Sequence, residues 1–196
     1  MILGITGSVG SGKTTAAKMF SGYHYKIIDA DEIGHKLLED SAIRNKLIKN
    51  FGVRILGNKK IIDRKKLGKT VFDDERKLEK LNSIMHPIIF REIKTKIKNI
   101  QKKYGAKTKI IIDVPLLLET DAKNMVDKVL VIKTFSQNII KRNKNFSKEM
   151  IEKISKFQMP LEEKIKHADF VIDNNGDLKN LKLKVSNLID KLNQEK

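Results

Sequence analysis

Apolar residues along the chain gather in short runs that alternate with longer amphipathic stretches. Five runs have the length of a strand, are bounded by polar residues and are rich in Ile or Val: residues 2–6, 26–29, 109–114, 128–133 and 170–173. Runs of this kind are typical of strands that are buried on both faces of a sheet. Because they alternate with helical stretches, we expect an α/β fold with a mainly parallel five-stranded sheet flanked by helices.

A long helical insert separates the second predicted strand from the third, over about residues 32–107. Apolar residues recur there at spacings of three and four, as on a helix with one face on a core. They form two stripes, namely Leu78, Leu81 and Met85, and then Ile89, Ile93, Ile97, Ile100 and Tyr104. Because Pro87 disfavours helix at His86 and can itself start a helix, we expect a break between two helices there.

Two further helical stretches follow the fourth and fifth strands. The first covers residues 136–167, and Pro160 is expected to divide it. At its start Thr134 with Gln137 fits a capping box, and Ser136 is an equally good cap. The second follows residues 176–177 and carries an apolar stripe, Leu181, Val185, Leu188 and Leu192. With 196 residues and no internal repeat, the chain is expected to form a single domain with helical lobes.

The first strand leads directly into a phosphate-loop pattern, G-x-x-x-x-G-K-[ST]. Its residues are Gly7, Ser8, Val9, Gly10, Ser11, Gly12, Lys13 and Thr14, followed by Thr15. In this context glycines let backbone N–H groups turn toward a polyphosphate, and the positive end of the next helix faces the anion. Lys13 is expected to reach the β- and γ-phosphates, and Thr14 to bind Mg²⁺. The pattern therefore predicts a P-loop protein that binds a nucleoside triphosphate.

The second strand ends in two aspartates, Asp29 and Asp31, at the sheet edge where ligands bind in open α/β folds. Alternation along a strand predicts that both carboxylates point the same way. One of them can accept the proton of an attacking hydroxyl during phosphoryl transfer, and we assign this role to Asp31. The alternative is that one of the pair caps the following helix, a role assigned to Asp29 or shared between them.

Three other residues are candidates for chemistry. Asp113 ends a strand of three isoleucines and is either a carboxylate of the magnesium shell or an ordinary strand-end residue. Glu119 follows it in a turn that could present its carboxylate to an acceptor. Arg142 has a planar guanidinium that suits phosphate oxygens in a closing lid, although it also fits a surface position.

Composition narrows the partners. Forty-one Lys and Arg against 24 Asp and Glu give a net charge of +17, which raises nucleic acid as a partner. The lysines are scattered, however, and only 6% of residues are aromatic, so little is present for base stacking. We interpret the charge as a solvated surface with a basic cleft for small polyanions.

The same composition bears on location. The chain has no cysteine, which excludes disulfides and thiolate metal sites. No apolar run approaches the roughly 20 residues of a membrane span, and no basic segment precedes the first apolar residues. We therefore expect a cytoplasmic protein without membrane or nucleic-acid partners, as a monomer or small homo-oligomer.

Read together, the motifs resemble one family, the dephospho-coenzyme A kinases. They occur in order between residues 1 and 176: the phosphate loop, Ile-Asp-Ala-Asp at 28–31, His86-Pro87, Asp-Val-Pro-Leu-Leu at 113–117, Gln-Met-Pro-Leu-Glu-Glu-Lys at 158–164, and Ala-Asp at 168–169 followed by Val-Ile-Asp-Asn-Asn-Gly at 171–176. The resemblance implies ATP- and Mg²⁺-dependent phosphorylation of the ribose 3′-hydroxyl of dephospho-coenzyme A, the last step of coenzyme A synthesis.

The resemblance also implies an assignment of regions and residues. Residues 1–31, 108–135 and 168–196 would be the P-loop core, about 33–105 a helical acceptor-binding lobe, and about 136–167 a helical lid. Asp31 would be the base, and Lys13 and Arg142 would be catalytic cations. The substrate would bind His86, Asp113 and Glu119, and the metal would bind Thr14 and Asp113. The ATP adenosine would lie near Asn174, Asn175 and Gly176.

The chain departs from the family pattern in its lid. A second lid arginine is frequent in the family, whereas here Lys144 or Lys156 would supply that charge. Leu118 stands where an aromatic residue is frequent, which we expect to be tolerated. The competing class is a P-loop nucleotide switch or a nucleic-acid-linked ATPase, which the basic charge favours and the lack of guanine-reading and helicase motifs disfavours.

Overall fold

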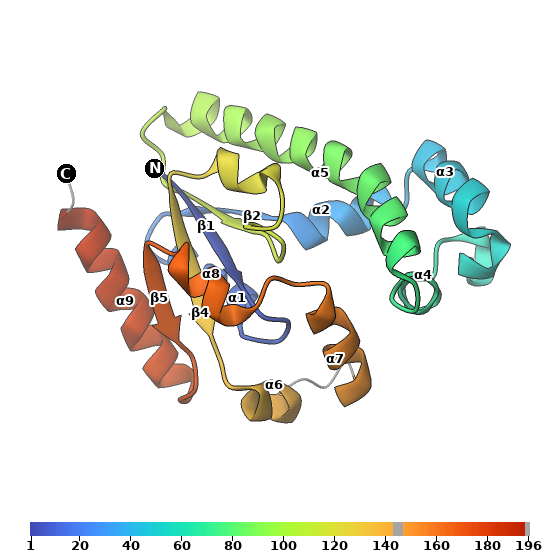
Figure 1. Cartoon of the computed structure of the whole chain (residues 1–196). Coiled ribbons are helices and arrows are strands. Elements are labelled where there is room, and N and C mark those ends of the chain that lie inside the picture. The colour runs from blue at the N-terminus through green and yellow to red at the C-terminus, as the bar shows by residue number, and fades with distance from the viewer. Residues whose placement is uncertain (143–146, 195–196) are drawn as a thin grey trace. The chain divides into compact units, whose positions relative to one another are not determined.

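The computed structural model describes residues 1–142 and 147–194, and these form two compact units (Figure 1). One unit comprises Met1–Asp29 with Lys94–Lys196, and the other comprises Ala30–Ile93. The first contains the sheet and the phosphate loop. The second is helical.

The sheet has five parallel strands in the order β2-β3-β1-β4-β5. Their bounds are β1 Ile2–Gly7, β2 Lys26–Asp29, β3 Ile110–Asp113, β4 Lys128–Lys133 and β5 Phe170–Asp173. The fold class and the strands predicted from the apolar runs are confirmed, with ends that differ by at most one residue. Parallel pairing brings all carboxyl ends to one edge, where β1 leads into the phosphate loop.

Two helices cover one face of the sheet, α1 (Lys13–Ser21) and α9 (Leu178–Gln194). They share one apolar cluster with the strands, which includes Ala16, Ala17, Phe20, Leu3, Ile5, Leu130, Ile172, Leu181, Val185, Leu188 and Leu192. Gly4 of β1 faces the other way, and a side chain there would collide with Leu117 and Val126. The segment after β3 therefore packs tightly against the centre of the sheet.

The remaining elements that lie wholly within this unit are short. They are η3 (Asp121–Met125), α6 (Ser136–Arg142), α7 (Lys148–Lys156) and α8 (Leu161–Lys166). Pro160 is the N-cap residue of α8, so the predicted division at this proline is confirmed. The predicted capping box is wrong, because the hydroxyl of Thr134 is buried and donates to backbone carbonyls outside the helix, those of Ser11 and Asn174.

The second unit is built from α2 (Ala30–Leu37), α3 (Ser41–Phe51), η1 (Val53–Ile55), η2 (Asn58–Lys60), α4 (Arg64–Val71) and the first part of α5 (Glu75–Tyr104). Asp40 and Asp63 cap α3 and α4 by accepting two backbone N–H groups each. A core of its own, which includes Leu47, Phe51, Ile55, Val71, Ile84 and Met85, holds these elements together.

Two features of this unit differ from the sequence-based expectation. Helix α5 continues through Pro87 without a break, although proline inside a helix costs about 3 kcal/mol. Buried residues on both sides of the proline, Met85 and Ile93 among them, offset that cost by packing. The predicted helical insert is also interrupted between α3 and α4. Gly52 ends α3, and an antiparallel bridge joins Leu56 to Ile62.

Candidate active site

The phosphate loop connects β1 to α1 and depends on glycine at two positions. Gly7 and Gly12 have positive φ angles of 149° and 92°, a region that side chains rarely adopt. Both positions are also crowded, because a Cβ on Gly7 would collide with the carbonyl oxygen of Ile132, and one on Gly12 with the amide of Asn174. The loop can lie this close to β4 and to the end of β5 only with glycine there.

The carbonyl group of Ser11 is held from two sides. Asn174 Nδ2 donates to its oxygen at 2.8 Å and Thr134 Oγ1 at 3.0 Å, and all three residues are buried. In a trans peptide the carbonyl oxygen and the next N–H point in opposite directions. The N–H of Gly12 is therefore directed away from Asn174 and Thr134. These two residues orient a loop amide before any ligand arrives, as an anion site made of backbone N–H groups requires.

Lys13 begins α1 and lies against the loop. Its Nζ donates to the carbonyl oxygens of Gly7 at 3.1 Å and Ser8 at 2.8 Å, and the side chain is buried. Thr14 and Thr15 follow in the exposed first turn of the helix. One ammonium group, the open helix N-terminus and the loop amides thus combine into a site that favours a polyphosphate.

The two predicted magnesium residues lie in contact. Thr14 Oγ1 donates to Asp113 Oδ2 at 2.7 Å, and Asp113 is only 3% exposed at the end of β3. A hydroxyl and a carboxylate oxygen are donors that suit Mg²⁺. The described residues contain no cluster of three or more His, Asp or Glu side chains that could bind a metal. A magnesium ion here would take its other ligands from phosphate and water, as this ion commonly does.

The loops after β4 and β5 are joined by Asn175. Its Oδ1 accepts from the backbone N–H of Phe135 at 2.8 Å and from Asn138 Nδ2 at 3.1 Å, while its own amide donates to Asp173. Phe135 and Gly176 are exposed beside it. The two loops therefore form one connected surface next to Asn174, which binds the phosphate loop through Ser11.

The segment between α7 and α8 also contacts the phosphate loop, which the sequence did not indicate. Gln158 Oε1 accepts the N–H of Val9 at 3.2 Å, and the adjacent Met159 N–H donates to Glu119 Oε1 at 2.9 Å. Glu119 pairs with Lys164 at 2.7 Å, and the Lys164 side chain is fully buried. The motif 158–164 carried the family resemblance, but no spacing in it pointed to the phosphate loop.

Comparison with known proteins identifies the family. The sequence model for dephospho-CoA kinase matches residues 1–180, most of the chain. The chain belongs to the dephospho-CoA kinase family. It is 41% identical over 189 residues to the dephospho-CoA kinase of Fusobacterium nucleatum, covering 94% of this chain and 95% of that one.

Solved structures agree with this assignment. The dephospho-CoA kinase of Campylobacter jejuni superimposes with a TM-score of 0.69 at 29% identity, covering 97% of this chain and 96% of that one. A crystal structure from Thermus thermophilus gives a TM-score of 0.79 at 26% identity, covering 98% and 97%. The predicted family and the P-loop kinase fold are thereby confirmed.

Asp31 lies in a different local structure from the one predicted. Strand β2 ends at Asp29 and α2 begins at Ala30, so Asp31 is an exposed residue of the first helical turn. The alternation of a strand therefore says nothing about its direction. Asp29, in register with Asp113, belongs to the first unit, whereas Asp31 belongs to the second. The assignment of the base to Asp31 stays a prediction.

His86 lies on α5, in the helical unit Ala30–Ile93. Its ring stacks on Phe90, with ring centroids 5.4 Å apart, and burial lowers the pKa of the imidazole below its ordinary value of 6.5. The histidine is therefore neutral at pH 7. Its predicted contact with the acceptor stays a prediction, because desolvation by the protein alone accounts for the shift.

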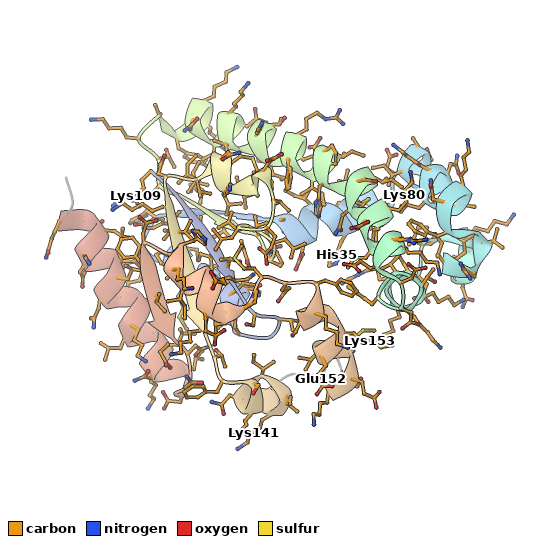
Figure 2. All side chains as sticks on the ribbon, viewed as in Figure 1. His35, Lys80, Lys109, Lys141, Glu152 and Lys153 are labelled. Atoms are coloured by element: carbon orange, nitrogen blue, oxygen red, sulfur yellow. The ribbon has the colours of Figure 1, made fainter. Side chains whose placement is uncertain are left out.

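The range predicted to be a lid, residues 136–167, contains α6, α7 and α8, and its role as a lid stays a prediction. Arg142 ends α6, but its side chain, like Lys144, lies outside the described residues. Lys141 on α6 and Lys153 and Lys156 on α7 are exposed, and Figure 2 labels the first two. None of the helices in residues 1–142 and 147–194 has the length and apolar character that a membrane crossing needs.

Proposed function

We propose that this chain transfers the γ-phosphoryl group of ATP to the ribose 3′-hydroxyl of dephospho-coenzyme A, giving coenzyme A and ADP. The observation that carries the proposal is the Thr14–Asp113 contact beside Lys13 in a phosphate loop, in a chain that matches the dephospho-CoA kinase family over residues 1–180. The reaction completes coenzyme A synthesis. In phosphoryl transfer the protein mainly positions groups and neutralises charge. The phosphate loop, Lys13, and Thr14 with Asp113 as metal ligands would do both.

The donor site is proposed to be residues 7–15 with Asn175 and Gly176. Backbone N–H groups of the loop bind the phosphate oxygens, and Lys13 exchanges its loop carbonyl contacts for the β- and γ-phosphates. Thr14 and Asp113 would hold Mg²⁺, which, when bound, neutralises charge on the phosphate oxygens. Asn175 and Gly176, beside exposed Phe135, are proposed to lie near the adenosine.

The acceptor is proposed to bind residues of the helical unit, Ala30–Ile93, which overlaps the predicted acceptor lobe of about 33–105 but ends earlier. Asp31 would accept the hydroxyl proton as the oxygen attacks phosphorus. His86, neutral at pH 7, is proposed as an acceptor contact, and so is Glu119. Arg142 is proposed to stabilise the transferred phosphoryl group from the lid.

We further propose a cytoplasmic monomer or small homo-oligomer that acts without nucleic acid. Support comes from the scattered lysines, the low aromatic content and the absence of cysteine. RNA- or DNA-stimulated ATP hydrolysis, indifferent to coenzyme A precursors, would instead favour the competing nucleic-acid-linked ATPase.

An acceptor panel tests the function. The purified chain is incubated with Mg-ATP and dephospho-coenzyme A, adenosine, other nucleosides and sugars, and the phosphorylated hydroxyl is located by NMR. We expect strong dependence on dephospho-coenzyme A and Mg²⁺, with phosphate on the 3′-oxygen. Preference for another acceptor would refute the substrate while leaving a kinase.

The role of Asp31 is tested by Asp31→Asn, with Glu32→Gln as the matched control. Both side chains lie in the exposed first turn of α2, and Glu32 pairs with Lys36 at 2.6 Å. Loss of a general base is expected to lower kcat by about a hundredfold or more with ATP affinity nearly unchanged. The control should retain wild-type turnover, and retained turnover in Asp31→Asn would remove the residue from its proposed role.

A further inference from the structure

Two neighbouring residues between α7 and α8 are tied to different parts of the nucleotide-binding unit. We define Gln158 and Met159 as the strap. Gln158 accepts the N–H of Val9, a residue of the phosphate loop, at 3.2 Å. The N–H of Met159 donates to Glu119, in the segment after β3, at 2.9 Å. The strap therefore connects the phosphate loop to the segment that packs against the sheet.

A buried ion pair fixes the far end of this connection. Lys164 on α8 is fully buried, and its Nζ lies 2.7 Å from the Glu119 carboxylate and 3.2 Å from the carbonyl oxygen of Pro115. The same Pro115 oxygen accepts from Thr6 Oγ1 in β1 at 3.0 Å. Glu119 is thus held by Lys164, which also bonds to the carbonyl oxygen that accepts from β1. A buried, hydrogen-bonded pair allows little movement of the groups attached to it.

We infer that Gln158 is a positioning residue for the phosphate chain of the nucleotide, and that the Glu119–Lys164 pair sets its position. The inference deepens the proposed function, because it names residues that determine affinity for ATP. The Gln158 amide holds the peptide of Val9 in one orientation before the nucleotide binds. Less conformational freedom is then lost on binding, which raises affinity without a direct contact to the ligand.

The residue type at position 158 is part of the inference. An amide oxygen accepts a hydrogen bond without carrying charge, so it can remain next to a loop that binds a polyphosphate. A glutamate would accept the same bond from Val9 but would place a negative charge beside the phosphates. If the Gln158–Val9 hydrogen bond had a purely structural role, glutamate at position 158 would preserve ATP affinity. If the bond acts at the phosphate site, glutamate would lower ATP affinity.

The test is equilibrium binding of ATP to the full chain by calorimetry, without acceptor. Loss of one net hydrogen bond in Gln158→Ala is expected to raise the ATP Kd by about 2- to 10-fold. Gln158→Glu is expected to bind ATP more weakly than Gln158→Ala, and the difference should shrink in high salt. In turnover assays both should raise the KM for ATP and leave the KM for dephospho-coenzyme A unchanged.

The ion pair is tested by Glu119→Gln, with Glu163→Gln as the control. Glu163 lies on the same helix as Lys164 and pairs with Lys166 at the same distance, 2.7 Å, but at the surface. Glu119→Gln should weaken ATP binding, and Glu163→Gln should not. Because Glu119 acts through Gln158, adding Gln158→Ala to Glu119→Gln should cost less than the sum of the two single effects.

The outcomes separate this inference from the proposed function. Wild-type ATP affinity in Gln158→Ala, better binding in Gln158→Glu than in Gln158→Ala, or additive effects of Glu119→Gln and Gln158→Ala would overturn it. Gln158→Ala leaves the ion pair intact, so its result does not depend on the stability of Glu119→Gln. A different result is that dephospho-coenzyme A fails as a substrate while ATP affinity still falls from wild type to Gln158→Ala to Gln158→Glu. In that case the substrate proposal fails and the positioning role of Gln158 stands.

Discussion

Breaking the buried Lys164–Glu119 pair is expected to lower the free energy of unfolding, and the structure allows the size of the loss to be calculated. The substitution is Glu119→Gln, which keeps the shape of the side chain and its acceptor oxygen but removes its charge. Lys164 would remain fully buried opposite a neutral group. At 2.7 Å and an effective dielectric constant of about 20, the Coulomb attraction is about 6 kcal/mol, most of which offsets the desolvation of the charges.

Breaking such a pair by removing one partner costs about 3–5 kcal/mol, because it leaves a buried charge uncompensated. For a chain of this length that corresponds to a fall in Tm of roughly 6–20 °C. Removing both charges in Glu119→Gln with Lys164→Met should recover most of the loss, because no uncompensated charge remains. The surface variant Glu163→Gln breaks a pair of equal length and should lose only about 0–1 kcal/mol.

The measurement is urea unfolding followed by circular dichroism at pH 7 for wild type, the single variants, the double variant and the surface control. We expect a large loss of stability for Glu119→Gln, a coupling of several kcal/mol in the double-mutant cycle, and a small loss for the control. A loss in Glu119→Gln no larger than in Glu163→Gln would refute this expectation, because burial would then have no effect on the energy of the pair.

Three further predictions concern the site. Gly12→Ala should weaken ATP binding at least about tenfold, because the residue has a φ of 92° and the new methyl group would collide with Asn174, and calorimetry would show this directly. Thr14→Val removes the donor to Asp113, so the Mg²⁺ concentration for half-maximal activity should rise, and an unchanged Mg²⁺ titration would exclude the threonine as a ligand. His86 has a pKa below 6.5 when folded, so the unfolded state takes up its proton first as the pH falls below 6.5, and wild type should lose stability relative to His86→Gln between pH 8 and pH 5.5. Parallel stability curves for these two proteins would contradict the last prediction.

The amino-acid sequence alone was sufficient for the sheet, the phosphate loop and the family. Runs of Ile and Val predicted every strand within one residue, because strands buried on both faces need nearly continuous apolar side chains. The spacing of Gly7, Gly12 and Lys13 predicted the anion site, because a local chain conformation and a helix start produce it. The sequence also named Thr14 and Asp113 separately as candidate magnesium ligands, whereas the contact between them was found only in the structure.

Tertiary structure decided what depends on residues far apart in the chain. Asn174 and Thr134 orient the Ser11 carbonyl from 163 and 123 positions away, and Gln158 reaches Val9 from 149 positions away. No periodicity encodes such contacts, because they arise only when loops after different strands meet at the sheet edge. Packing also overrode a local preference at Pro87, where the helix continues because buried neighbours outweigh one missing hydrogen bond.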